Sequence, residues 1–210
     1  MVEANSSDKV LSPARLVHVV LRTNKFKPMV EYYKALLGAH VVFSTPNLAF
    51  ITYDDEHHRI AIAAFPGVTD KVPGSAGLEH IAFCFDTLSD LVTAYRQRKA
   101  RGIEPIWCVN HGPTTSMYYQ DPDGNQVEMQ VDNFDTAEEA TAFMVDPQFA
   151  NNPLGVDYDP EELIKRIESG EPEANIKRRP NSGPRDVTTV PLLNPPPPLV
   201  KDSYEVISAA

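Results

Sequence analysis

The sequence predicts an α+β fold in which one βαβββ unit occurs twice. Two apolar, strand-like runs, at 16–21 and 78–83, carry a histidine in the same place, His18 and His80. After each run come a polar break, a segment with helical spacing and three further strand-like runs. Two such units can pair into an open barrel, in which equivalent positions face each other across the interior. The repeat therefore predicts one cavity that holds both histidines.

In the first unit the helix is predicted over 26–37, because its apolar residues recur at helical spacing and Gly38 is placed to end it. These apolar residues are Phe26, Met29, Val30, Tyr33, Leu36 and Leu37. Three strands are predicted after the helix, at 40–44, 48–53 and 59–65.

In the second unit the helix is predicted over 89–101, with apolar residues at Leu91, Val92, Tyr95 and Ala100 and with Gly102 at its end. The strands are predicted at 106–109, 116–119 and 126–131. The segment 121–125, Asp-Pro-Asp-Gly-Asn, indicates a tight turn between the last two strands.

The composition changes near Phe134, after which proline becomes frequent. Thr136 is placed to cap a helix through Val145, and Asp159 is placed to cap another that ends near Gly170. We therefore expect four parts. They are an N-terminal tail over 1–12, a folded domain over 13–134 with units at 13–67 and 77–134, a helical extension over 135–170, and an extended Pro-rich tail over 171–210.

Composition and charge exclude several classes of function. Hydrophobic residues make up 42% of the chain, which is enough to form a core. The formal net charge of -10 argues against a nucleic-acid partner, because such proteins need a basic face. The first residues lack the pattern of a signal peptide, and no apolar run is long enough to cross a bilayer. The sequence thus predicts a cytoplasmic protein with no membrane partner.

The two cysteines, Cys84 and Cys108, are too few for a disulfide framework or a cysteine-based zinc site. Both lie in apolar, strand-like runs. We therefore expect two buried free thiols.

The chemistry of the chain is expected to depend on His18, His80 and Glu128. A single histidine in an apolar strand is more often a core residue than a ligand, but a core has no reason to bury two at equivalent positions of a repeat. Glu128 lies in an otherwise apolar strand, where a carboxylate is costly to bury unless it is paired or bound to a metal. Two imidazoles and one carboxylate suit Fe(II) and leave coordination positions open. They also suit Mn(II) or Zn(II), so the sequence does not fix the metal.

With these motifs, the segment from Arg15 to Phe134 resembles the vicinal-oxygen-chelate superfamily, which includes glyoxalase I, methylmalonyl-CoA epimerase and type I extradiol dioxygenases. The resemblance implies that His18, His80 and Glu128 bind one divalent metal. Glyoxalase I and the epimerases commonly add a ligand from the fourth strand. Here that strand reads Ile-Ala-Ile-Ala-Ala over 60–64, which favours the dioxygenase branch.

Three further residues resemble pocket residues of the extradiol enzymes. The pair at 57–58 resembles their double histidine, whose second member, here His58, is the acid–base residue near O2. His111 and Tyr118 take the places of a second pocket histidine and a tyrosine that hydrogen-bond the substrate. The spacing from His111 to Tyr118 is shorter than in the large enzymes, and those enzymes carry four units where this chain carries two.

The resemblance implies an Fe(II)-dependent dioxygenase that cleaves a catecholic or related vicinal-diol aromatic ring, with a small aromatic substrate and O2 as its partners. One alternative is a metal-dependent isomerase, epimerase or lyase of the glyoxalase type. Another is a non-catalytic protein that binds a small molecule in the same barrel. Strict O2 consumption separates the first from both alternatives. The C-terminal extension would suit a contact between copies in a homo-oligomer.

Overall fold

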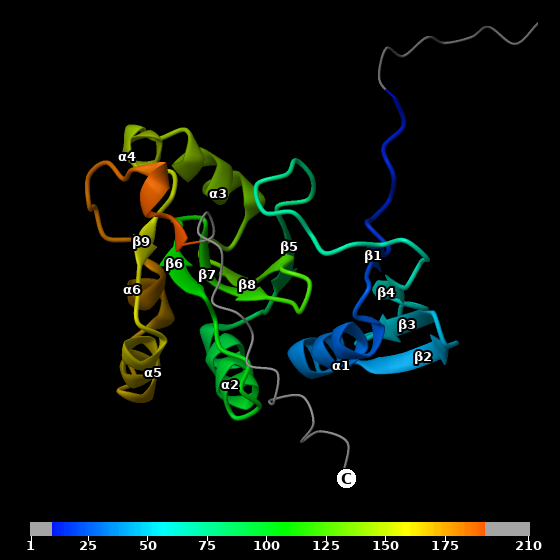
Figure 1. Ribbon diagram of the computed structural model, residues 1–210. Coiled ribbons are helices and arrows are strands. Elements are labelled where there is room, and N and C mark those ends of the chain that lie inside the picture. The colour runs from blue at the N-terminus through cyan, green and yellow to red at the C-terminus, as the bar shows by residue number, and fades with distance from the viewer. Residues whose placement is uncertain (1–9, 192–210) are drawn as a thin grey trace, which may run out of the picture.

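The computed structural model describes residues 10–191 and shows two β-sheets, one formed by each repeat (Figure 1). The first sheet has the order β1-β4-β3-β2, with β1 and β4 parallel and the other pairs antiparallel. Its elements are β1 (Val19–Arg22), α1 (Phe26–Leu37), β2 (His40–Ser44), β3 (Leu48–Thr52) and β4 (Ile60–Ala63).

The second sheet repeats this arrangement and gains one strand, in the order β5-β8-β7-β6-β9. Again the first strand pairs in parallel with the last strand of its unit, β8. The elements are β5 (His80–Cys84), α2 (Leu88–Lys99), β6 (Trp107–Asn110), β7 (Thr114–Gln120), β8 (Gln126–Asp132) and β9 (Val156–Asp157). The α+β class and the doubled βαβββ order predicted from the sequence are confirmed.

Helices α1 and α2 each cover one face of their own sheet, and the two covered faces share one hydrophobic core. Large side chains of both units are fully buried there, among them Tyr33, Leu36, Leu91 and Met129. The Tyr33 hydroxyl, on α1, donates to Asp121 Oδ2 in the second unit at 3.0 Å. The interior between the units is therefore apolar with a few satisfied polar contacts.

Arg98 joins the two units. It lies on α2, is almost fully buried, and donates from Nε to the backbone carbonyl of Leu36 at the end of α1, at 2.7 Å. Its guanidinium lies over the rings of Phe85 and Tyr119, at 5.4 and 5.3 Å from their centroids.

We expect Arg98→Met to lower the free energy of unfolding by about 1–3 kcal/mol, because the Leu36 carbonyl would stay buried without a donor. Urea unfolding of the purified chain measures this change, with Arg96→Met as a matched control. Arg96 is exposed and pairs with Glu168, so its loss should change stability by less than about 0.5 kcal/mol. A gain of stability in Arg98→Met would mean that the cost of burying the guanidinium exceeds its contacts.

The two sheets do not close into one barrel within the described chain. β1 is an edge strand of the first sheet and β5 is an edge strand of the second. The uncovered face of the first sheet is apolar and open, with Val20, Val42 and Phe43 each about half exposed. The expectation of a single open barrel around both histidines is therefore not met by one copy of the chain.

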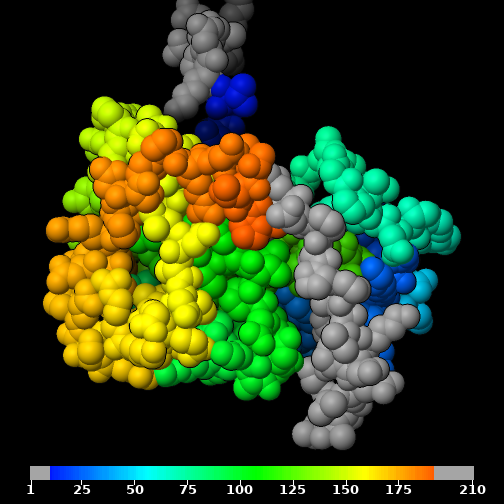
Figure 2. All heavy atoms as spheres, turned by 60° about the vertical axis from the view of Figure 1, so that its left-hand side comes forward, coloured from blue at the N-terminus to red at the C-terminus, as the bar shows by residue number. Residues whose placement is uncertain are grey.

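The described part of the extension folds against the second unit, as Figure 2 shows in yellow and orange beside the green second sheet. Its elements are α3 (Ala137–Met144), α4 (Pro147–Asn151), α5 (Pro160–Glu168), α6 (Glu173–Lys177) and a 3-10 turn (Val187–Thr189). Thr136 and Asp159 cap α3 and α5 as predicted. The sequence did not predict α4, α6 or β9, each of which is at most five residues long. The proline run at 195–198 lies outside the described residues.

Cys108 is buried, but Cys84 is exposed, so the prediction of two buried thiols is wrong for Cys84. Side chains alternate along β5, and Cys84 lies on the same face as His80, the face that α2 does not cover. Within residues 10–191, no helix is long and apolar enough to cross a membrane.

Candidate active site

One half of the candidate site lies on the first sheet, around His58. The His58 side chain is buried, and its ring is stacked between Phe50, at 4.4 Å, and His18, at 4.3 Å between centroids. Nδ1 of His57 lies 2.6 Å from Nδ1 of His58, so one of the two rings donates to the other. Burial, followed by the rings of His18 and His57, lowers the pKa of His58. A neutral His58 can accept a proton.

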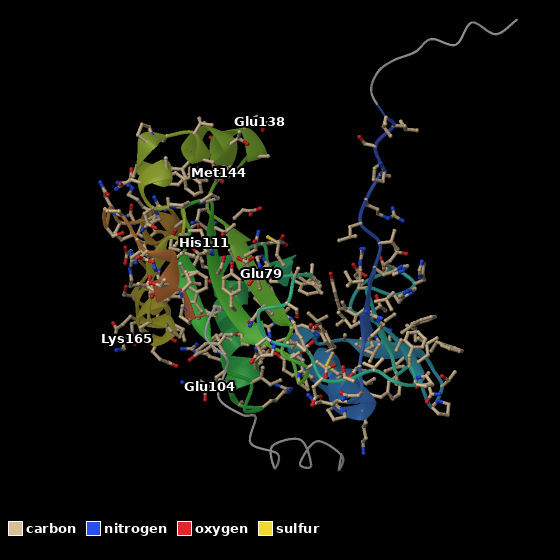
Figure 3. All side chains as sticks on the ribbon, turned by 45° about the horizontal axis from the view of Figure 1, so that its top comes forward. Glu79, Glu104, His111, Glu138, Met144 and Lys165 are labelled. Atoms are coloured by element: carbon tan, nitrogen blue, oxygen red, sulfur yellow. The ribbon has the colours of Figure 1, made fainter. Side chains whose placement is uncertain are left out.

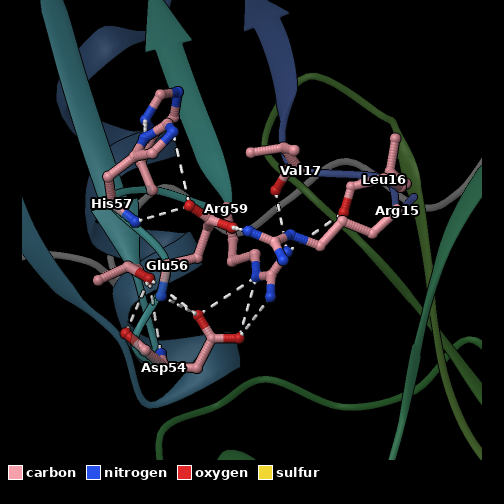
Figure 4. A network of polar contacts seen from close by, with 9 residues as sticks. Arg15, Leu16, Val17, Asp54, Glu56, His57 and Arg59 are labelled. Carbon is pink, nitrogen blue, oxygen red and sulfur yellow. Dashed lines mark hydrogen bonds and ion pairs between the residues drawn. The ribbon is translucent and has the colours of Figure 1, made fainter. Parts of the chain in front are cut away.

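Arg59 fixes the chain segment that carries His18 (Figure 4). Its Nη1 donates to the backbone carbonyls of Leu16, at 3.3 Å, and Val17, at 3.1 Å. Asp54 holds the guanidinium through a 2.9 Å hydrogen bond from Nε, and this contact lowers the pKa of the carboxyl. Because the carbonyls before His18 accept from a side chain, β1 begins at Val19, one residue beyond the histidine.

The other half of the site lies on the second sheet, where His80 and Glu128 meet. His80 Nε2 lies 3.0 Å from Glu128 Oε2, and Nδ1 of the same ring contacts the Glu79 carboxylate. The hydrogen bond to Glu128 raises the pKa of His80 to about 9. Burial opposes the charge of Glu128, but hydrogen bonds from His80 and Ser116 outweigh it and lower the pKa of Glu128. The pair is therefore an imidazolium hydrogen-bonded to a carboxylate. A metal cation could replace the proton that lies between them.

Tyr118 and His111 lie beside this pair on the same face of the sheet. Tyr118 is opposite Glu128 across β7 and β8, and its ring meets His80 edge-on at 5.4 Å. His111 Nε2 lies 3.0 Å from the Tyr118 hydroxyl. Trp107 stacks on Tyr118 at 5.0 Å and closes the other side. Figure 3 labels Glu79, which directly precedes β5, and His111, which directly follows β6, with α3 beyond one end of this sheet.

Burial governs the protonation of both polar rings. It raises the pKa of Tyr118, and the Glu128 charge adds to this effect. It lowers the pKa of His111. Near neutral pH both side chains are therefore neutral, and their hydrogen bond joins a phenol to a neutral imidazole.

The structure brings the six predicted site residues into two clusters but does not join the clusters. The first holds His18 and His58, and the second holds His80, Glu128, Tyr118 and His111, as the contacts above show. Within residues 10–191, no group of three or more His, Cys, Asp or Glu side chains is placed to hold one metal ion. A cleft of about 1220 Å³ separates the units, and it is lined by β1, the linker 65–79 and the turn 120–126.

Several residues that shape these clusters were not predicted from the sequence. Arg59 and Arg179 lie far in sequence from the carbonyls that they contact, whereas Trp107 stacks on Tyr118 of the neighbouring strand. The sequence does hold one weak signal, since Trp107 is the single tryptophan and lies in a predicted strand of the second unit. Nothing in the pattern of residues 171–191 indicated that Arg179 would reach His111.

Comparisons with known proteins find similar chains, two of which match more than three quarters of this chain. Two relatives from Rhodococcus globerulus are similar to this chain. Biphenyl-2,3-diol 1,2-dioxygenase 2 is 48% identical over 163 residues, covering 77% of this chain and 86% of the relative. Biphenyl-2,3-diol 1,2-dioxygenase 3 is 44% identical over 167 residues, covering 79% and 88%. Lactoylglutathione lyase of Escherichia coli O157:H7 is 25% identical over 122 residues, covering 55% and 90%.

The family model that matches covers residues 15–129, which span both βαβββ units up to the middle of β8 and contain all six residues of the two clusters. This range agrees with the segment that the repeat marks in the sequence. The chain belongs to the Glyoxalase/Bleomycin resistance protein/Dioxygenase superfamily.

Proposed function

We propose that this chain is an extradiol-type ring-cleavage dioxygenase, which opens a catecholic or related vicinal-diol aromatic ring with O2. The observation that carries the proposal is the sequence identity of 44–48% to two biphenyl-2,3-diol 1,2-dioxygenases over more than three quarters of the chain. The cluster of His80, Glu128, Tyr118 and His111 supports it, because it sets neutral hydrogen-bonding groups beside a ligand-type pair. The cytoplasmic location expected from the sequence stays a prediction.

The residues present fit a divalent metal, with Fe(II) as our proposal. Glu128 is buried, and within residues 10–191 its ion-pair partner is the His80 imidazole; a cation can replace the proton between the two side chains. His18, His80 and Glu128 would hold the ion and leave positions open for substrate and O2. When bound, the ion supplies a place where both substrate oxygens and O2 meet and exchange electrons.

The side chains of this chain supply binding and proton handling. His58 is neutral and stacked, so it can take a proton from a substrate hydroxyl and return it later. Tyr118 can hydrogen-bond a substrate oxygen from the opposite side, and His111 orients the Tyr118 hydroxyl through their mutual hydrogen bond. Phe50 offers a flat apolar surface that suits an aromatic ring.

The glyoxalase-type alternative is disfavoured by β4. All four residues of this strand, Ile60–Ala63, are apolar and buried, so the strand offers no further ligand. The test is O2 uptake after anaerobic reconstitution of the full chain with Fe(II), screened against a panel of catechols. We expect one O2 consumed for each catechol, with a yellow ring-opened product. Isomerisation of a hemithioacetal without O2 uptake would overturn the proposal.

We further propose that a second copy of the chain completes the metal site. Each copy carries His18 on one open sheet face and the pair of His80 and Glu128 on another, and these halves are apart within one chain. In each sheet of the described chain, the edge strand next to the candidate ligands has no strand on its outer side. This strand is β1 in the first sheet and β5 in the second. Exposed strand edges with apolar faces pair readily with other chains. Two copies related by a two-fold axis would join β1 of one to β5 of its partner, twice.

This pairing of sheet edges differs from the expectation from the sequence, in which the C-terminal extension made the contact between copies. The described extension packs on its own second unit, with Tyr95 and Lys99 of α2 hydrogen-bonded to Glu161 of α5 at 2.7 and 2.6 Å. The open apolar surface lies instead on the first sheet, around Val20 and Phe43. We therefore place the contact between copies on the sheets.

Mixing two inactive variants tests this arrangement. His18→Ala and Glu128→Ala should each be inactive alone, because each removes a ligand from every site. After the two are unfolded together and refolded, about a quarter of wild-type turnover should return, since half of the dimers are mixed and each mixed dimer holds one complete site. A mixture that stays inactive, although light scattering shows dimers, would place all three ligands within one copy.

A further inference from the structure

The C-terminal extension reaches the candidate site at one point, the turn that carries Leu154. This turn lies outside residues 15–129, the range of the family model. Strand β9 follows the turn and pairs with β6, with Val156 opposite Asn110, the residue before His111. Leu154 itself packs on the cluster that contains Trp107 and Tyr118. The extension therefore lines one side of the second half-site, the cluster of His80, Glu128, Tyr118 and His111.

The Leu154 backbone carbonyl determines which nitrogen of His111 carries the proton. His111 Nδ1 lies 2.9 Å from this carbonyl oxygen, which can only accept a hydrogen bond. Nδ1 must therefore carry the hydrogen, and in the neutral ring Nε2 is left as an acceptor. Nε2 faces the Tyr118 hydroxyl at 3.0 Å, so Tyr118 donates. The extension thus sets the direction of a hydrogen bond inside the family domain.

The turn is built to stay against His111. Asn152 Oδ1 accepts from the Gly155 backbone N–H at 2.9 Å, and Asn152 Nδ2 donates to the Gly155 carbonyl at 3.0 Å. Gly155 has φ of +92°, and a Cβ there would lie 2.4 Å from the Asn110 carbonyl and 2.8 Å from His111 Cα. Only glycine allows the two backbones to approach this closely.

Arg179 ties the turn to the backbone of His111. Its Nη1 donates to the carbonyl of His111 at 2.9 Å and to that of Asn152 at 2.6 Å. The guanidinium is buried against the rings of Phe143 and Phe149, at 5.3 and 5.8 Å from their centroids. Within residues 10–191, no carboxylate pairs with it. A buried guanidinium is costly, and this one uses its donors to hold two backbone segments together.

We propose that the extension is part of the active site, in which Arg179 and Gly155 are positioning residues that hold the Leu154 carbonyl on His111. His111 then keeps its proton on Nδ1 and accepts from Tyr118. Because Tyr118 donates to His111, its oxygen presents lone pairs to the pocket and accepts from a substrate hydroxyl. This last role rests on the proposed function, whereas the state of His111 does not.

The test is a long-range ¹H–¹⁵N spectrum of the full chain labelled with ¹⁵N-histidine and recorded without added metal, in which His111→Gln identifies the His111 signals. Wild type should show one neutral tautomer, protonated on Nδ1. Arg179→Met and Gly155→Ala should show both tautomers. After loading with Fe(II), turnover of both variants should fall by a factor on the order of 10 to 100 with metal content unchanged, as for other groups that orient a site residue.

Arg166→Met is the matched control, because Arg166 pairs with Glu171 and has no contact with His111. It should leave the spectrum and turnover unchanged. A His111 protonated on Nε2 alone in wild type would overturn the proposal. So would a doubly protonated ring, since Tyr118 would then donate to Glu128, its cross-strand neighbour. An Nδ1 tautomer that survives in both variants would also overturn it. A wild type with the expected tautomer but no O2 uptake would instead remove only the proposed function.

Discussion

His18→Ala, His80→Ala and Glu128→Ala should each lose most of the bound metal and all measurable ring cleavage. Each side chain is proposed as a direct ligand, and loss of an outer-shell partner alone typically weakens metal binding by about 10- to 100-fold. The fold should persist, because none of the three belongs to the shared hydrophobic core. Iron per chain after anaerobic reconstitution and desalting measures the effect, and circular dichroism checks the fold.

His40→Ala is the control for these variants, since His40 lies exposed on β2 and contacts neither cluster. It should keep its metal and its activity. A full equivalent of iron in all three ligand variants would show that the metal binds elsewhere. Loss of metal in His80→Ala and Glu128→Ala but not in His18→Ala would show that the second half-site binds the metal without His18.

Loss of His58 should slow turnover by a factor on the order of 10² to 10⁴ while metal and substrate stay bound. This is the usual contribution of a positioned acid–base group. His58→Phe is the sharper variant, because the new ring can stack between Phe50 and His18 as the imidazole does. Steady-state O2 uptake gives the change in turnover, and the absorption of the bound catechol shows that substrate still binds.

The neighbouring histidine provides the contrast. The side chain of His57 is 64% exposed, whereas that of His58 is buried, so His57→Ala should cost far less turnover than His58→Phe. Equal turnover of His58→Phe and wild type would exclude the acid–base role of His58. A large loss in His57→Ala alone would assign that role to the preceding residue.

Much of the fold follows from local pattern. The apolar spacing of Phe26 to Leu37 and the glycine at 38 gave helix α1 its exact limits, because a packed helix needs one continuous apolar stripe. The doubled order of one strand, one helix and three strands was visible because each element has its own apolar pattern. Strand limits were less accurate. β1 begins after His18 rather than at Leu16, because the backbone carbonyls of residues 16 and 17 accept hydrogen bonds from Arg59, which is over 40 residues away.

The candidate site was predictable only in part, because its assembly depends on contacts between distant segments. The ligand-type residues stand out in apolar strands, and in the structure His80 lies against Glu128. The position of His18 in a separate cluster could not be foreseen, since the repeat does not tell whether its halves pair within one chain or between two. The contact of Arg179 with His111 joins residues 68 positions apart and has no local signal.

Trp107 gives this protein a built-in optical reporter. The indole is the single tryptophan of the chain, and its Nε1 donates to Asp157 on β9 at 2.7 Å while its ring stacks on Tyr118. One chromophore thus touches both the extension and the pocket, with no background from a second. Its emission responds to the polarity and hydrogen bonding of this one place. Stopped-flow fluorescence of unlabelled protein can therefore time the arrival of an aromatic ligand separately from the chemical steps that follow.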